Sequence, residues 1–80
     1  MSKLLPNQEL DMCGVKCPVP LLKTKMALKE MIVDQLLMVK TTEETSRKDI
    51  LRYIDKSIHS LLSVETTGNV TTIKIQVGSL

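Results

Sequence analysis

Four short segments along the chain combine apolar and polar residues in the way expected of β-strands. In the first, Leu10 and Met12 alternate with acidic residues, so that one face is apolar. The second is almost continuously apolar and partly β-branched, which is typical of a strand covered on at least one face. Gly68-Asn69 separates the last two and is a typical hairpin turn. The predicted strands are 8–12, 35–41, 62–67 and 70–77.

Between the first two strands, apolar residues recur at helical spacing. The helix is expected to begin in the segment Cys17-Pro18-Val19-Pro20 and to run to Met31. Pro18 and Pro20 fall at its first and third positions, where the missing backbone N–H has no intrahelical partner to lose. The expected apolar face comprises Leu21, Leu22, Met26, Leu28, Met31 and Ile32, opposite a polar side of Lys23, Lys25, Lys29 and Glu30.

A second helix is expected after the second strand. Ser46 is the predicted N-cap, and Asp49 follows three residues later as a capping-box-like acid. His59 is expected near the helix end, as a partly exposed residue that the C-terminal end of the helix dipole favours. The residues that repeat along the predicted buried face are Ile50, Ile54, Ile58 and Leu61.

The resulting order is βαβαββ. Right-handed crossovers return to the same face when the strand order advances in one direction, so both helices are expected on one side of the sheet. We therefore predict an α/β fold, an α+β two-layer sandwich with a mixed four-stranded sheet and two helices on one face. A chain of 80 residues makes one domain, 1–80, with its core at about 8–77.

Composition narrows the function classes. Hydrophobic residues make up 42% and charged residues 25% of the chain, which favours a folded globular protein over disorder. Tyr53 is the only aromatic residue, so stacking of bases on aromatic platforms is not expected. A net charge of +2, with the lysines spread along the chain, gives no basic run for nucleic acid. We expect no direct nucleic-acid binding.

The distribution of apolar residues also bears on location. No apolar stretch is long enough to cross a bilayer, and the first residues lack the apolar run and cleavage site of a signal peptide. We expect a cytoplasmic protein without membrane insertion.

Cys17 is the candidate nucleophile. A cysteine immediately before a helix has its sulfur near unpaired backbone N–H groups, here chiefly those of Val19 and Leu21, and near the positive end of the helix dipole. Lys16 adds a neighbouring positive charge. These features favour the thiolate, although a cysteine that merely caps the helix fits the same position, and position alone leaves both interpretations open.

Cys13 is the second cysteine, and three residues separate it from Cys17, where redox dithiols of the thioredoxin type use two. A cytosolic pair is more often catalytic, redox-active or metal-binding than a structural cross-link, so a disulfide stays open. Structural zinc needs four ligands, and only His59 and scattered carboxylates could add to the cysteines, so no metal is expected. Four methionines are expected to fill the core: Met12, Met26, Met31 and Met38.

The segment 10–20, Leu-Asp-Met-Cys-Gly-Val-Lys-Cys-Pro-Val-Pro, resembles the signature of the TusA/SirA/YedF family of sulfur carriers. In that family a strand ending in an acidic residue leads through a glycine to Cys-Pro-x-Pro at the start of the first helix. The resemblance implies that Cys17 carries persulfide sulfur. The supporting positions in the motif are Gly14, Lys16, Pro18 and Pro20, with Cys13 as an addition to it.

The resemblance extends over nearly the whole chain, because Asp49-Ile50 looks like the Asp-Ile pair that opens the second helix in the family and His59 falls at a common histidine position. Four positions depart from the family pattern and bear on the choice of partner. Glu43-Glu44 replaces a common Asp-Pro, Leu51 replaces a proline, and Gln76 replaces a commonly basic residue.

The resemblance implies a covalent sulfur carrier of the sulfurtransferase type that works with partner enzymes and needs no cofactor. It would accept sulfane sulfur from a protein donor, a desulfurase or rhodanese-like protein, and pass it to a protein acceptor. Family members serve tRNA thiolation, molybdenum-cofactor supply, sulfur oxidation and thiosulfate use.

Two other functions stay open at the level of the sequence. One is a dithiol redox protein that cycles Cys13 and Cys17 between thiol and disulfide. The other is a non-catalytic regulatory interaction domain in which the cysteine is only structural.

Overall fold

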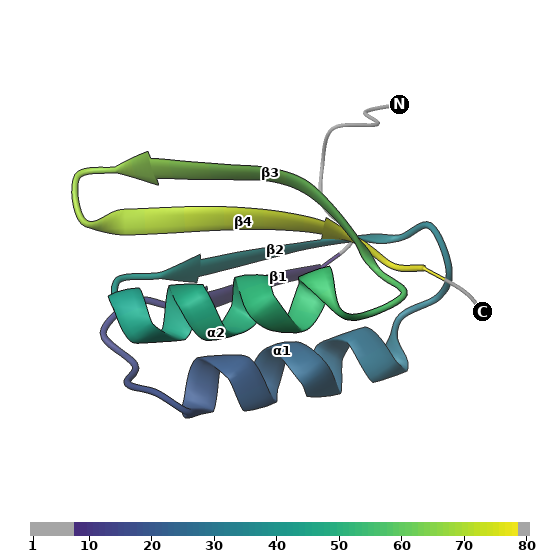
Figure 1. Cartoon of the computed structure of the whole chain (residues 1–80), viewed down its shortest axis with the longest axis horizontal. Coiled ribbons are helices and arrows are strands. Elements are labelled where there is room, and N and C mark those ends of the chain that lie inside the picture. The colour runs from purple at the N-terminus through teal and green to yellow at the C-terminus, as the bar shows by residue number, and fades with distance from the viewer. Residues whose placement is uncertain (1–7, 79–80) are drawn as a thin grey trace.

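The structure, a computed structural model, describes residues 8–78 and has the predicted βαβαββ order. Figure 1 shows the two helices side by side on one face of the sheet, so the predicted two-layer α+β sandwich is confirmed. Residues 1–7 and 79–80 of the predicted domain lie outside the described range. The elements are β1 (Gln8–Met12), α1 (Val19–Glu30), β2 (Leu36–Thr41), α2 (Glu44–Asp55), β3 (Ser60–Thr67) and β4 (Val70–Gln76).

The strands are arranged in the order β1-β2-β4-β3. β1 and β2 are parallel, with Met12 opposite Thr41 at their ends, whereas β4 runs antiparallel to both β2 and β3. Because parallel strands end at the same edge of a sheet, the segments that follow β1 and β2 meet there. This edge holds the candidate site.

The core lies between the sheet and the two helices. Along β2 and β4, every second residue is buried and faces the helices, which is the period expected of a sheet with one covered face. Ile50 of α2 is fully buried against this surface. Burying each such side chain stabilises the fold by roughly 1.5–3 kcal/mol. The buried apolar residues are Ala27, Leu28, Leu37, Val39, Ile50, Ile54, Ile73, Ile75 and Val77.

α1 buries a different face from the one predicted. Its buried residues are Pro20, Thr24, Ala27 and Leu28. Leu22 and Met26 are instead 51% and 59% exposed, so the predictions that Leu22 belongs to the apolar face and that Met26 fills the core are wrong. Ile32, which follows the helix, is also exposed. The helix is apolar on two sides, and the side with the small Thr24 and Ala27 allows the closer approach to the sheet.

α2 begins and ends earlier than predicted. Its N-cap is Glu43, and Ser46 lies inside the first turn, where its hydroxyl donates to Glu43 Oε1 at 2.9 Å. The predicted cap at Ser46 is therefore wrong. The helix ends at Asp55 because the backbone N–H and the hydroxyl of Ser57 both donate to the carbonyl of Ile54.

The early end of α2 places His59 outside the helix, in the segment that leads into β3. Its Nδ1 accepts a hydrogen bond of 3.0 Å from the backbone N–H of Gly78. Burial lowers the pKa of His59 below its ordinary value. His59 is partly exposed, as predicted, but the prediction that it lies near the end of the helix and is favoured by the helix C-terminus is wrong.

The hairpin between β3 and β4 agrees with the prediction. Gly68 has a φ of 62°, in the left-handed region that glycine adopts without a steric penalty. β3 is an edge strand, and its apolar Leu61, Leu62 and Val64 are exposed. In the part of the chain that the structure describes, neither helix is long and apolar enough to span a membrane.

Candidate functional site

The loop between β1 and α1 is held in place by the segment that follows β2. The N–H of Gly14 donates to Thr42 Oγ1 at 2.8 Å, and the N–H of Cys17 donates to Glu43 Oε1. Gly14 has a φ of 81°, which redirects the chain after β1. Two of the loop's backbone donors are thus satisfied by side chains of the neighbouring segment, which fixes the position of Cys17.

Cys17 lies just before the N-cap of α1. The helix begins at Val19, so Pro18 is the N-cap and Pro20 the second helical position, and each lies one position earlier relative to the helix than predicted. The Cys17–Pro18 peptide bond is cis. Val19 donates its N–H to the carbonyl of Lys16 at 3.1 Å. This group is therefore not directed at the sulfur, contrary to the prediction.

The sulfur of Cys17 contacts α2. Its Sγ donates to Oδ2 of Asp49 at 3.3 Å. This hydrogen bond raises the pKa of the Cys17 thiol, and partial burial and the negative charges of Asp49 and Glu43 raise it further. The expectation of a thiolate favoured at the helix start is wrong for the isolated protein, because two carboxylates act on the sulfur.

Cys13 is exposed and has its own acidic neighbour. Its backbone N–H donates to Asp11 Oδ1 at 3.1 Å. The side-chain hydrogen bond to Asp11 raises the pKa of Cys13, and hydrogen bonds from Cys13 lower the pKa of Asp11. Both cysteines are free thiols. Each thiol is thus held next to a carboxylate.

The other predicted site residues differ in their exposure to solvent. Pro20 is buried in the first turn of α1, whereas Lys16 and Pro18 are exposed. Lys16 forms none of the ion pairs found within residues 8–78. His59 follows the C-terminal end of α2 and contacts Gly78, so it does not join Cys17.

Sequence reasoning did not assign Thr42, Glu43 and Asp49 to the site. Thr42 and Glu43 come directly after a strand parallel to β1, and polar residues at the carboxyl ends of neighbouring parallel strands commonly line ligand sites. That signal could have drawn attention to them. The same signal could not have identified Asp49, because the contact of Asp49 with Cys17 depends on how α2 packs beside α1.

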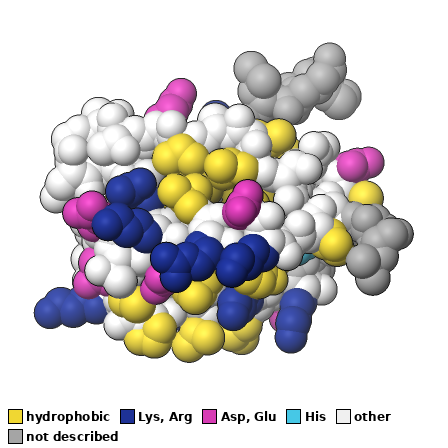
Figure 2. All heavy atoms as spheres, viewed as in Figure 1, with side chains coloured by type: hydrophobic (Ala, Val, Ile, Leu, Met, Phe, Trp, Pro, Cys, Tyr) yellow, Lys and Arg dark blue, Asp and Glu magenta, His cyan; other side chains and the backbone are white. Residues whose placement is uncertain are grey.

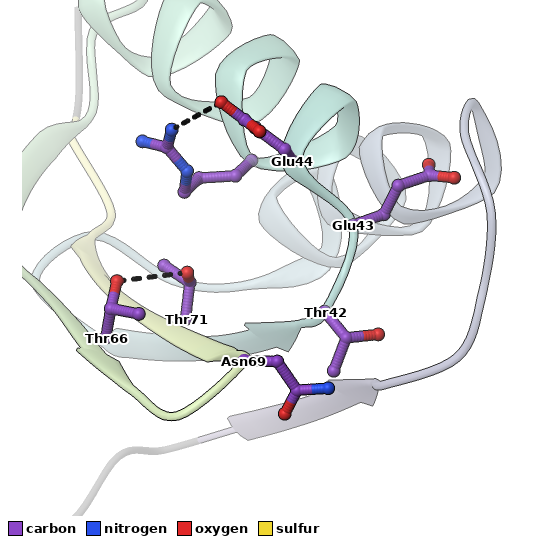
Figure 3. A pocket seen from close by; sticks show the side chains of 7 residues that line it. Thr42, Glu43, Glu44, Thr66, Asn69 and Thr71 are labelled. Carbon is purple, nitrogen blue, oxygen red and sulfur yellow. Dashed lines mark hydrogen bonds and ion pairs between the residues drawn. The ribbon is translucent and has the colours of Figure 1, made fainter.

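No group of three or more His, Cys, Asp or Glu residues suited to a metal ion occurs within residues 8–78. An open pocket of about 300 Å³ lies on the other side of Glu43, between α2 and the β3–β4 hairpin, and neither cysteine lines it. Figure 3 shows Glu44 on α2 and Thr66 and Thr71 on the facing strands, and Glu44 pairs with Arg47 of the same helix at 3.7 Å. The pocket is lined by Thr42, Glu43, Glu44, Arg47, Thr66, Asn69 and Thr71.

Comparison with known sequences identifies the family of this chain. The family profile described as "Sulfurtransferase TusA" matches residues 8–77. The chain belongs to the TusA family of sulfur carriers. The resemblance seen in the segment 10–20 is therefore confirmed.

Individual relatives agree with the TusA assignment. The "Sulfur carrier protein TusA" of Allochromatium vinosum is 34% identical over 62 residues, covering 78% of this chain and 82% of the relative. The "Putative sulfur carrier protein YrkI" of Bacillus subtilis is 32% identical over 72 residues, covering 90% and 96% of the two chains. A crystal structure of a SirA-like protein from Desulfitobacterium hafniense superposes with a TM-score of 0.78 at 22% identity, covering 90% of this chain and 99% of that one. This last likeness supports the TusA-type fold alone.

Proposed function

We propose that the protein carries sulfane sulfur as a persulfide on Cys17 and passes it from a protein donor to a protein acceptor. The observation that carries the proposal is the placement of a free, half-buried thiol in Cys-Pro-Val-Pro at the start of α1, in a chain of the TusA family.

The proposed chemistry is a pair of thiol–persulfide exchanges. The Cys17 thiolate attacks the outer sulfur of a donor persulfide, a new S–S bond forms, and the donor leaves as a thiolate with the electron pair of the broken S–S bond. The acceptor thiolate then attacks the outer sulfur on Cys17 in the same way, and Cys17 leaves as a thiolate. There is no net oxidation or reduction, so the transfer needs no cofactor.

The neighbouring motif residues have supporting roles in this proposal. Gly14 supplies the left-handed backbone of the loop, and Pro20 is buried in the first turn of α1. Pro18 and Lys16 remain exposed beside the sulfur, where a partner protein can contact them. Cys13 is not required for single-site sulfur transfer.

The surface beside Cys17 suits a protein partner. An apolar stripe on α1 consists of Val19, Leu22 and Met26, which are 40%, 51% and 59% exposed. Figure 2 shows apolar side chains gathered along α1 at the lower edge of the molecule, with basic side chains beside them. Lys23 is one of the exposed basic residues of α1. We infer that a donor such as a desulfurase or rhodanese-like protein, and an acceptor protein, approach Cys17 from this side.

The proposed location of this relay is the cytoplasm, where thiols are kept reduced. Thiolation of tRNA, sulfur oxidation and thiosulfate use are the pathway classes that the family suggests. In each of them the carrier meets a partner protein and not the nucleic acid itself.

Intact-mass measurement after incubation with a persulfide donor tests the proposal. Wild type and Cys13→Ser should each gain about 32 Da per sulfur, and a reductant should remove this added mass. Cys17→Ser should show no such gain. Loss of two hydrogens in wild type through disulfide closure, without sulfur gain in either single variant, would support the dithiol redox function instead. No change in any of the three proteins would favour the regulatory interaction domain.

A further inference from the structure

The sulfur of Cys17 faces two carboxylates that have no ion-pair partner within residues 8–78. Asp49 Oδ2 accepts the hydrogen bond from Sγ at 3.3 Å, and Glu43 Oε1 accepts the backbone N–H of the same residue. Within residues 8–78, neither Asp49 nor Glu43 takes part in an ion pair. We call these two residues the acidic pair.

The basic residues near the acidic pair are engaged elsewhere or exposed. On α2, Arg47 and Lys48 both pair with Glu44, at 3.7 and 3.6 Å. In the β1–α1 loop, Lys16 is exposed, and on α1, Lys23 is exposed. At the strand edge, Asp11 bonds to Cys13 and Lys40 pairs with Glu9 at 3.5 Å.

A thiol that donates to an ionised carboxylate is stabilised in its protonated form, and a thiolate in the same place would be repelled by the negative charge. The raised pKa of Cys17 agrees with this geometry. Because the thiolate is the nucleophile, the isolated protein holds Cys17 in its less reactive form. A sulfur carrier with an always-ionised thiol would react with any electrophile that it met, so this restraint contributes to specificity.

We propose that Asp49 is a positioning residue that keeps Cys17 protonated and directed toward α2, and that a partner releases the thiolate by placing a basic side chain against the acidic pair. The role given to the partner rests on the proposed function, because it requires that a partner protein docks beside Cys17. The partner is a protein with an Arg or Lys side chain beside its own reactive sulfur. Such a cation offsets the carboxylate charge only in the docked complex, so the nucleophile forms where the sulfur is to be transferred.

The first measurement is the pH profile of iodoacetamide alkylation, followed by intact mass. All proteins carry Cys13→Ser, so that Cys17 is the only thiol. Asp49→Asn should shift the profile to lower pH. The matched control is Glu44→Gln, which removes the same charge from α2 at an exposed position that does not contact Cys17. Intrinsic nucleophilicity falls with pKa, so the rate near neutral pH should rise by less than the fraction of thiolate does.

The second measurement compares two small disulfides as probes, the dication cystamine and the neutral 2-hydroxyethyl disulfide. In each, the Cys17 thiolate attacks one sulfur and the other half leaves as a thiolate. The protein with both carboxylates should react faster with cystamine than with 2-hydroxyethyl disulfide. The ratio of these two rates should fall severalfold in Asp49→Asn and stay the same in Glu44→Gln. This ratio responds to charge beside the sulfur, which a merely structural role of Asp49 would not change.

Profiles and probe ratios that are the same in Asp49→Asn and Glu44→Gln would overturn the proposal. If Asp49→Asn does not fold, the probe ratio of the Cys13→Ser protein alone decides. A preference for cystamine that declines with added salt supports the proposal, and no preference overturns it. None of these probes transfers sulfane sulfur, so a failed sulfur gain on Cys17 would refute the carrier function while leaving this result standing.

Discussion

The Sγ atom of Cys17 lies 3.3 Å from Oδ2 of Asp49, although the two residues are 32 positions apart in the chain. The contact joins the start of α1 to the first half of α2, and Glu43 joins the same loop through the backbone N–H of Cys17. The chemistry of the cysteine is therefore set jointly by both helix starts.

The left-handed conformation of Gly14 leads to a prediction about stability. A Cβ at Gly14 would meet nothing within 4 Å, so the cost of Gly14→Ala comes from the backbone conformation alone. That cost is about 1–2 kcal/mol for an L-residue, and Asn tolerates the region better. Urea unfolding should show a larger loss for Gly14→Ala than for Gly14→Asn. Equal stability of Gly14→Ala and wild type would contradict the φ of 81°.

The two sides of α1 should respond differently to truncation. Leu28 is 3% exposed and packs in the core, so Leu28→Ala should lower the free energy of unfolding by about 2–5 kcal/mol. Leu22 is 51% exposed, and Leu22→Ala should change it by no more than about 0.5 kcal/mol. Chemical denaturation of both variants checks the orientation of the helix. A Leu22→Ala loss as large as that of Leu28→Ala would show that α1 is rotated.

His59 should make stability depend on pH near neutrality. Its pKa is lowered in the folded protein below the ordinary 6.5, so the unfolded chain takes up the proton first as the pH falls. The stabilising effect of neutral His59 is therefore present above pH 6.5 and is lost as the pH falls through 6.5 toward the lower folded-state pKa. Melting temperatures measured from pH 7.5 down to 5 should decline, in a range above the titration of ordinary carboxylates.

The matched variant for this prediction is His59→Asn, which keeps a side-chain acceptor for the N–H of Gly78 but does not titrate. Its melting temperature should vary less with pH over the same range. Parallel pH curves for wild type and His59→Asn would rule out His59 as the source of the dependence.

The strand pattern allowed much of the fold to be predicted from the sequence. The prediction for β1 agrees with the structure at both ends, and the turn at Gly68-Asn69 is confirmed, because alternation and turn chemistry are local properties. The buried face of α1 could not be predicted in the same way. Leu22 and Met26 are as apolar as Leu28, and the buried side differs from theirs in carrying the small Thr24 and Ala27.

The site shows the same division between local and distant information. Cys17, its helix start and its family could be recognised from the segment 10–20. The direction of the pKa shift of Cys17 could not be predicted from that segment. Lys16 and the helix start adjoin Cys17 in the sequence, whereas Asp49 and Glu43 are brought to the sulfur by the packing of α2. The N-cap of α2 was misplaced for a related reason: Ser46 has a capping side chain, but its hydroxyl donates back to Glu43.

The central claim, that Cys17 receives sulfane sulfur and hands it on, is tested most directly by following one sulfur through both steps. Cys13→Ser protein is loaded from a persulfide donor, freed of the donor and mixed with glutathione. Samples are then taken over time for intact mass, and matched samples are quenched with excess bimane to measure glutathione persulfide. We predict that the protein loses about 32 Da as an equal amount of glutathione persulfide appears, and that Cys17→Ser yields none. A protein that takes up no sulfur on Cys17, or that keeps the sulfur in the presence of the acceptor thiol, would contradict the claim.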